Sequence, residues 1–182
     1  MYGEPAAVEL ADGTVAMFIR NSSGRIHIAH SRDHGETWKL VEADGPNTCN
    51  APCIVRRVPD SDDLLLIWNN NAIRSNLTAA ISRDSGRSWA NYRILEEQET
   101  WPMSRSYAYP SLAFLNGNAH ITYWETHTHR TAERLFHLVY RRLPMSWFYE
   151  DRTHRAPVCE IDRSFLSADT VYDGEESREV KP

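Results

Sequence analysis

Short runs in which hydrophobic and polar residues alternate follow one another along most of this chain, separated by turns rich in Asp, Asn and Gly. Alternation with a period of two is typical of half-buried β-strands. The runs form three similar segments, which begin at Glu4-Pro5, Ala51-Pro52 and Tyr109-Pro110. Three strands are predicted in each segment, at residues 7–10, 14–19 and 25–30, then 53–55, 64–68 and 76–81, then 112–115, 119–124 and 134–140. No helix longer than a short turn is predicted.

In the first two segments the third strand leads into the same motif, S-x-D-x-G-x-[ST]-W, at residues 31–38 and 82–89. We expect Asp33 and Asp84 to accept hydrogen bonds from backbone N–H groups two or three residues ahead, and the glycine to adopt a positive φ. The tryptophan is expected to pack back over the hairpin. Two copies 51 residues apart, with all five fixed positions kept, indicate an internal repeat. The third segment lacks the turn but keeps a tryptophan, Trp147.

Repeating units of about 50 residues, built from hairpin-linked antiparallel strands, have the dimensions of β-propeller blades. We therefore predict an all-β fold in which residues 1–150 form a partial β-propeller of about three blades. Propellers typically have about four to eight blades, so we expect either missing N-terminal blades or self-association. Residues 151–182 break the repeat and are predicted to form a polar C-terminal tail.

The composition narrows the function classes. The formal net charge is −5 with both signs interspersed, which gives no reason to expect nucleic acid or an anionic membrane as partner. No apolar run approaches the ~20 residues of a membrane-spanning helix. Cys49, Cys53 and Cys159 lack paired spacing and are interpreted as ordinary thiols. His127 and His129 would share one side of a strand, but no third ligand has suitable spacing, so no metal site is predicted. The compartment is left open.

The two motifs resemble the Asp-boxes of the sialidase (neuraminidase) superfamily, specifically its BNR-repeat members, whose catalytic domain is a six-bladed β-propeller. The resemblance extends over roughly residues 4–149 and corresponds to the second half of a catalytic domain of that superfamily. It implies that the Asp-boxes lie at the periphery of the blades, away from the active site, and support the fold.

Four further residues match the catalytic pattern of that superfamily. Tyr109 matches the nucleophilic tyrosine, and Glu4 matches the glutamate that partners the nucleophile. Arg20 and Arg74 match the second and third of three arginines that bind the substrate carboxylate. The resemblance also implies that the acid/base aspartate and the first arginine come from earlier blades, and that no cofactor is required.

The repeat supports part of this assignment independently. Glu4 and Tyr109 occupy the same position in their segments, directly before the proline. In a propeller these strands line the central channel, so the two side chains are expected to face one another. A phenol with a pKa near ~10 is a weak nucleophile at neutral pH, and a carboxylate within hydrogen-bond reach can take its proton. Taken singly, Glu4, Arg20 and Arg74 have an ordinary alternative as surface charges, and Tyr109 as a packed ring.

The combined interpretation is a retaining exo-glycosidase that releases a terminal sialic acid, or a related 2-keto sugar acid, from glycoconjugates. Tyr109 would form the glycosyl-enzyme intermediate, Glu4 would be its base, and Arg20 and Arg74 would bind the carboxylate. Residues 69–71, all asparagine, form either a polar loop over this face or a plain turn. Two alternative functions stay open: a non-catalytic Asp-box propeller that binds glycans or proteins, and a glycosidase on the same scaffold that acts on a different acidic sugar.

Overall fold

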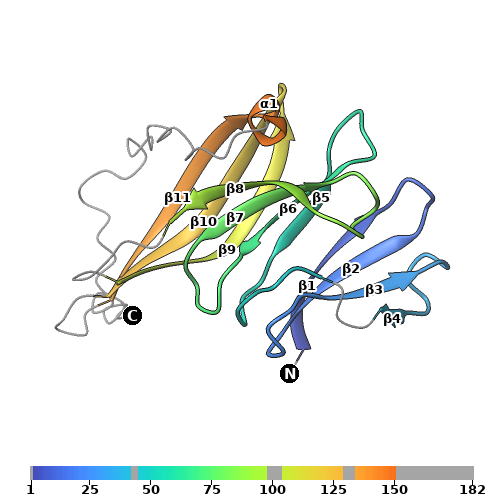
Figure 1. Ribbon diagram of the computed structural model, residues 1–182, viewed down its shortest axis with the longest axis horizontal. Helices are drawn as coiled ribbons and strands as arrows, with labels where there is room; N and C mark the ends of the chain where they lie inside the picture. The colour runs from blue at the N-terminus through green and yellow to red at the C-terminus, as the bar shows by residue number, and fades with distance from the viewer. Residues whose placement is uncertain (1, 42–44, 98–103, 129–133, 151–182) are drawn as a thin grey trace, which may run out of the picture.

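The computed structural model describes residues 2–41, 45–97, 104–128 and 134–150; the predicted tail at 151–182, with Cys159, and His129 lie outside them. The described chain consists of three antiparallel sheets (Figure 1). The first sheet contains β1 (Tyr2–Glu9), β2 (Val15–Asn21), β3 (His27–Ser31) and β4 (Lys39–Val41). The second contains β5 (Ile54–Arg57), β6 (Leu64–Asn69), β7 (Leu77–Ser82) and β8 (Ala90–Glu96). The third contains β9 (Ser104–Leu115), β10 (Asn118–Thr128) and β11 (Arg134–Pro144), and a short helix, α1 (Met145–Tyr149), follows it.

The predicted strands are present with shifted ends, and the structure adds β4 and β8 as fourth strands of the first two sheets. One detail of the prediction was wrong. The first strands of the first and third sheets begin before the prolines rather than after them, β1 at Tyr2 and β9 at Ser104. Pro5 and Pro110 instead lie inside these strands, where the pairing register with the neighbouring strand shifts. A proline cannot donate to the strand ladder and is tolerated at such a bulge.

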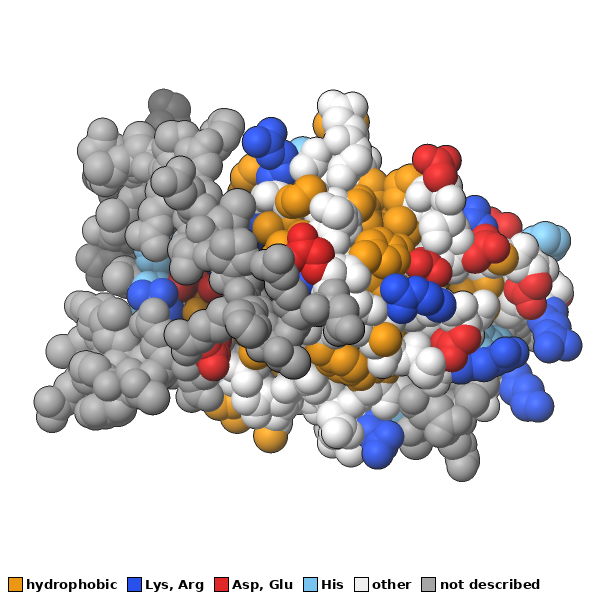
Figure 2. All heavy atoms as spheres, turned by 45° about the horizontal axis from the view of Figure 1, so that its top comes forward, with side chains coloured by type: hydrophobic (Ala, Val, Ile, Leu, Met, Phe, Trp, Pro, Cys, Tyr) orange, Lys and Arg blue, Asp and Glu red, His pale blue; other side chains and the backbone are white. Residues whose placement is uncertain are grey.

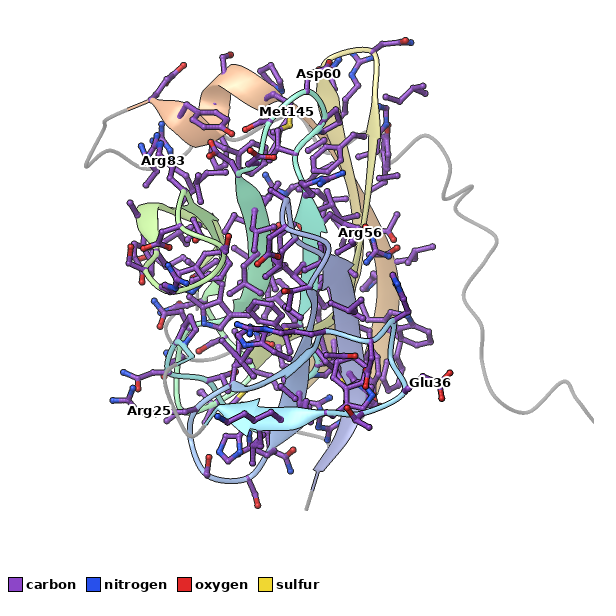
Figure 3. All side chains as sticks on the ribbon, turned by 90° about the vertical axis from the view of Figure 1, so that its right-hand side faces the viewer. Arg25, Glu36, Arg56, Asp60, Arg83 and Met145 are labelled. Atoms are coloured by element: carbon purple, nitrogen blue, oxygen red, sulfur yellow. The ribbon has the colours of Figure 1, made fainter. Side chains whose placement is uncertain are left out.

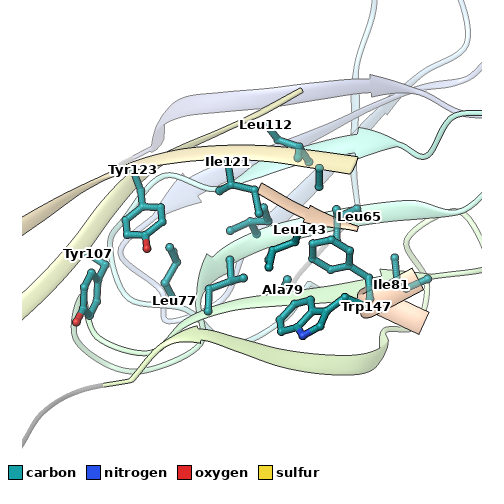
Figure 4. Packing of buried hydrophobic residues seen from close by; sticks show 14 of the residues in the cluster. Leu65, Leu77, Ala79, Ile81, Tyr107, Leu112, Ile121, Tyr123, Leu143 and Trp147 are labelled. Carbon is teal, nitrogen blue, oxygen red and sulfur yellow. The ribbon is translucent and has the colours of Figure 1, made fainter. Parts of the chain in front are cut away.

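The second sheet is covered on both faces, since every residue of β6 and β7 is buried. Side chains alternate between the faces of a strand. Leu65 and Ile67 belong to the core shared with the third sheet, whereas Leu66 and Trp68 belong to the core shared with the first sheet. Figure 4 shows the former core, to which Trp147 of α1 also belongs together with Leu65 and Ile81. The second sheet is therefore the middle layer of the molecule.

The first strands of the three sheets lie next to one another, β1 beside β5 and β5 beside β9. Blades of a β-propeller are arranged in this way around their axis. The start of β1 pairs with the end of β2, and the start of β9 with the end of β10, so these termini share one end of their sheets. Figure 3 shows this end, marked by Arg25 in the β2–β3 connection, opposite the end marked by Asp60 and Met145.

The two Asp-boxes are closed by the same internal hydrogen bonds. Asp33 accepts from the backbone N–H of Thr37 at 2.9 Å and from its hydroxyl at 2.5 Å. Asp84 accepts from the N–H and hydroxyl of Ser88 at 2.8 and 2.5 Å. The donors lie four residues ahead, rather than the two or three predicted, because the serine that opens each motif accepts the intervening glycine N–H, at 2.8 Å in both. Each turn is thus held by its own side chains.

The glycine and tryptophan of the motif behave as predicted. Gly35 and Gly86 have φ values of +96° and +87°, a region that other residues rarely adopt. Trp89 packs edge to face on Phe18 of β2, with ring centroids 6.0 Å apart. The second Asp-box therefore also joins the first and second sheets.

The lowered pKa of the Asp33 carboxyl in the first Asp-box predicts that the fold loses stability in acid. The Thr37 hydroxyl, the Thr37 backbone N–H and the Ser31 hydroxyl lower the pKa of Asp33 from 3.8 to about 2. A carboxyl whose pKa is lower in the folded than in the unfolded state stabilises the fold above about pH 4, and this stabilisation disappears as the pH falls toward about 2. We expect Asp33→Asn to lower the urea midpoint of unfolding at pH 7. The gap between the midpoints of the variant and the unsubstituted chain should close in acid. A gap that stays constant down to about pH 2 would contradict the assignment.

Candidate active site

Glu4 and Tyr109 occupy equivalent and unusual backbone positions. Each directly precedes a proline at a bulge, Glu4 in β1 and Tyr109 in β9. Their φ values are 43° and 56°, in the left-handed region. Residues other than glycine rarely adopt this region, and such positions cluster at functional sites. A bulge changes the direction in which a side chain points from its strand. The bulges therefore redirect the side chains of Glu4 and Tyr109, which lie on the first strands of their sheets.

The structure brings these two side chains together. The Tyr109 hydroxyl donates to Glu4 Oε1 at 3.2 Å, across 105 positions of sequence. Tyr109 is 48% exposed, and the Glu4 side chain is 43% exposed, so a molecule from solvent can reach both. A phenol hydrogen-bonded to a carboxylate can be deprotonated as it attacks an electrophile.

Arg20 lies on the Glu4 side of this pair. It is near the end of β2, which pairs with β1, and its Nη1 forms an ion pair with Glu4 Oε2. Its Nε donates to Asn50 Oδ1 at 2.8 Å. Burial lowers the pKa of Arg20, but its interactions with Glu4 and then with Tyr109 outweigh burial and raise the pKa above its ordinary value. Arg20 therefore contacts Glu4 directly, and its hydrogen bond to Asn50 fixes its orientation.

Arg74 lies on the Tyr109 side. It belongs to the connection between β6 and β7, and its guanidinium carbon is 5.7 Å from the centre of the Tyr109 ring. Its Nη2 donates to the backbone carbonyl of Asn50 at 3.3 Å. Within the described part of the chain, Nε and Nη1 of Arg74 have no hydrogen-bond partner. These donors remain available to an anionic ligand.

Asn50 joins the two arginines, and the sequence interpretation did not single it out. Its side-chain oxygen accepts from Arg20 and its backbone oxygen accepts from Arg74. The available signal was its position, since Asn50 immediately precedes Ala51-Pro52, the start of the second repeat. The segment before it is fixed by two bonds: the Thr48 N–H donates to Gly24 O at 2.9 Å, and Trp68 Nε1 donates to Asn47 O at 2.9 Å.

Asn69 fastens the connection that carries Arg74 to the strand that carries Tyr109. It is fully buried at the end of β6, and its Nδ2 donates to the backbone oxygen of Tyr107 at 3.0 Å. The Tyr107 N–H in turn donates to the Arg74 backbone oxygen at 2.7 Å. Of the two alternatives for residues 69–71, the plain turn does not describe Asn69, because its side chain bonds across to the third sheet.

A pocket of about 600 Å³ has Asn50 in its wall. The β2–β3 connection, the segment before β5 and the connection after β6 form its walls. Its polar side chains are those of Ser22, Asn47, Thr48, Asn50, Asn70 and Asn71. Asn50 thus belongs both to this wall and to the support of the two guanidinium groups.

Other chemistry finds little support in the described residues. Among them, no group of three or more His, Cys, Asp or Glu side chains has the arrangement of a metal site. Cys49 and Cys53 are free thiols, and burial raises the pKa of Cys53 to about 12, so it is not a nucleophile at neutral pH. No helix in the described part of the chain is long and apolar enough to cross a membrane. On the face shown in Figure 2, basic and acidic side chains are intermingled.

Comparison with known proteins places this geometry in context. The signature of a family described as BNR repeat-like domain matches residues 3–121. The NanB sialidase of Streptococcus pneumoniae, as a K499G mutant, superimposes with a TM-score of 0.61 at 22% identity, over 79% of this chain and 23% of the sialidase. An alpha-L-arabinanase of Penicillium chrysogenum, complexed with arabinobiose, gives 0.55 at 17% identity, over 79% of this chain and 46% of that enzyme. An ulvan lyase gives 0.61 at 16%, over 79% and 39%.

These likenesses bear out the predicted all-β propeller fold and the Asp-box repeat. The chain spans less than half the length of each of the three neighbours. At these identities the likeness concerns the fold alone. No curated protein matches the sequence significantly.

Proposed function

The chain belongs to the BNR repeat-like domain family, and from this premise we propose that it carries part of the active site of a retaining exo-glycosidase of the sialidase type. The proposed substrate is a glycan that ends in sialic acid or a related 2-keto sugar acid. The proposal rests on the 3.2 Å hydrogen bond from Tyr109 to Glu4, flanked by the guanidinium groups of Arg20 and Arg74. The activity is proposed for a complete protein, since this chain spans only part of its structural neighbours.

In the proposed reaction, Tyr109 Oη attacks the anomeric carbon, the bond to the leaving oxygen of the glycan breaks, and Glu4 accepts the phenolic proton. Water then attacks the same carbon, and the phenolate leaves and recovers its proton from Glu4. Two displacements retain the configuration. In the complete protein, the acid/base aspartate of the superfamily pattern would protonate the leaving oxygen and later deprotonate the water.

The choice of a phenol fits an acidic sugar. An uncharged nucleophile approaches a carbon that bears a carboxylate without the repulsion that a second anion would meet. Arg20 and Arg74 would bind that carboxylate, because a planar guanidinium can donate two parallel hydrogen bonds to it. Within the described chain, Nε and Nη1 of Arg74 have no hydrogen-bond partner, so donors of this guanidinium remain for that carboxylate.

Arg74→Lys is expected to lower kcat/KM for the sugar-acid glycoside by about 10- to 100-fold, because lysine keeps the charge but loses the paired donors. The measurement is steady-state kinetics on the complete protein. Arg87→Lys, the same change at an exposed position of the second Asp-box, is the matched control and should leave kcat/KM unchanged. Equal kinetics for the Arg74 and Arg87 variants would remove Arg74 from the carboxylate site.

The test of the function itself compares three fluorogenic glycosides, of sialic acid, glucuronic acid and arabinofuranose. We expect release of the fluorophore from the sialic acid glycoside alone. Turnover of the glucuronide alone would favour a glycosidase for a different acidic sugar. Binding of a sialylated glycan without any turnover would favour the non-catalytic alternative.

A further inference from the structure

Two buried asparagines, Asn21 and Asn69, occupy equivalent places in the first and second sheets. Each is the last residue of the second strand of its sheet, β2 or β6. Nδ2 of Asn21 donates to the backbone oxygens of Ile19 and Arg25 at 3.3 and 2.6 Å, and its Oδ1 accepts the Ser23 N–H at 2.7 Å. These three bonds lie within β2 and the connection that follows it, so they hold a local turn.

Asn69 differs from Asn21 in reaching another sheet. Its Nδ2 donates to the backbone oxygen of Ser75 in its own connection at 3.4 Å, and also to that of Tyr107 on β9 at 3.0 Å. Its Oδ1 is buried and has no hydrogen-bond partner among the described residues. A buried acceptor without a donor costs free energy. Holding a local turn therefore does not account for this amide, and the bond to β9 needs its own explanation.

Together with Tyr107, Asn69 attaches the connection that carries Arg74 to β9 at two points. The Tyr107 backbone oxygen accepts from Asn69, and the Tyr107 N–H donates to the Arg74 backbone oxygen at 2.7 Å. Two bonds fix the orientation of the connection, whereas one bond alone leaves it free to rotate. β9 itself is paired with β10 from Ser104 to Leu115, but residues 70–76 belong to no strand. Loss of the Asn69 amide would therefore displace Arg74 rather than β9.

We infer that Asn69 is a positioning residue of the site: through the backbone of β9 it holds the Arg74 guanidinium beside the Tyr109 ring, at 5.7 Å from its centre. The inference rests on the proposed function, because it takes Arg74 as a group that binds the carboxylate of the substrate. Asn69 is fully buried and does not touch the ligand. Because the carboxylate is bound in the ground state as well as in the transition state, Asn69 affects KM more than kcat.

The test is Asn69→Ala in the complete protein, with steady-state kinetics on the sialic acid glycoside. We expect KM to rise about tenfold, the effect of about one hydrogen bond, and kcat to change by less than about twofold. A variant that is merely less stable would instead lose kcat with its folded fraction and keep its KM. Asn91→Ala is the matched control, because Nδ2 of Asn91 on β8 also donates across the chain, to the Tyr149 backbone oxygen of α1 at 3.2 Å. It should keep the original KM.

Two further measurements address the route of the effect. In an Arg74→Ala background the guanidinium is absent, so adding Asn69→Ala should leave KM unchanged. Without any substrate, hydrogen exchange of the Tyr107 N–H should be faster in Asn69→Ala than in the unsubstituted protein, because its bond to Arg74 loses the neighbouring support. Asn69→Ser, which leaves a smaller cavity, takes the place of the alanine variant if that variant does not fold.

The outcomes separate this inference from the proposed function. An unchanged KM in the Asn69 variant, or a rise in KM of the same size in the Arg74→Ala background, would overturn the positioning role while the glycosidase activity stands. Unchanged exchange of the Tyr107 N–H would overturn it whatever the activity. If the unsubstituted complete protein neither cleaves the glycoside nor binds sialic acid, the proposed function fails, and the role of Asn69 in carboxylate binding falls with it.

Discussion

Replacing Tyr109 by phenylalanine is expected to lower turnover of the sugar-acid glycoside by about 10³-fold or more, while binding is nearly unchanged. The variant removes one oxygen, the atom that donates to Glu4 at 3.2 Å, and keeps the ring that lies near Arg74. Because the reacting atom is lost and the surroundings are kept, the effect belongs in kcat. The measurement combines steady-state kinetics, for turnover, with calorimetric titration of sialic acid, for binding.

Tyr92→Phe is the matched control for this variant. Tyr92 is also about half exposed, at 50%, but it lies on the edge strand β8 of the second sheet. The control is expected to retain full turnover. If the Tyr109 variant kept turnover at the level of the control, Tyr109 would not be the nucleophile, and a carboxylate mechanism would have to be considered in its place.

Trp68→Ala is expected to lower the free energy of unfolding by about 3–5 kcal/mol. Trp68 is fully buried in the core between the first and second sheets, and its Nε1 donates to the backbone oxygen of Asn47. The substitution opens a cavity and leaves that oxygen without its donor. Urea unfolding of the complete protein, followed by circular dichroism, measures the change.

Trp124→Ala supplies the comparison, because Trp124 lies on β10 and is 50% exposed. Surface substitutions usually change stability by less than about 0.5 kcal/mol, so only a small effect is expected. Trp68→Phe, which keeps a large ring, should fall between the two. Equal destabilisation by the Trp68 and Trp124 alanine variants would contradict the placement of Trp68 between the first two sheets.

Much of the fold could be predicted because the same pattern of strands and Asp-box occurs twice in the sequence. The alternating runs locate the strands, and the paired Asp-boxes set the length of a unit. The equivalence of Glu4 and Tyr109 in their units also predicts that their side chains approach one another. The Tyr109 hydroxyl is 3.2 Å from Glu4 Oε1. This inference succeeds because it depends on register within a repeat, and register is fixed wherever a sheet has a buried face.

The elements that were missed have no such pattern. β4 has three residues, and β8 reverses the usual pattern, since Arg93 is buried while Tyr92 and Ile94 are exposed. The burial of Arg93 depends on Trp147, whose ring lies 5.0 Å from its guanidinium, and on the Glu150 backbone oxygen. Asn50 was missed for a related reason, because its importance comes from two arginines on other segments. Contacts between distant segments of this kind have no local period in the sequence.

The left-handed backbone at Glu4 and Tyr109 lowers the stability of the chain at the two positions that carry the proposed chemistry. A residue other than glycine in this region costs about 1–3 kcal/mol, and both positions carry one, at φ 43° and 56°. Glycine would relieve the strain at either position, and it would also delete the phenol or the carboxylate. A redesign guided by thermostability alone would therefore select against the chemistry first, so these two positions have to be held fixed when the rest of the chain is optimised.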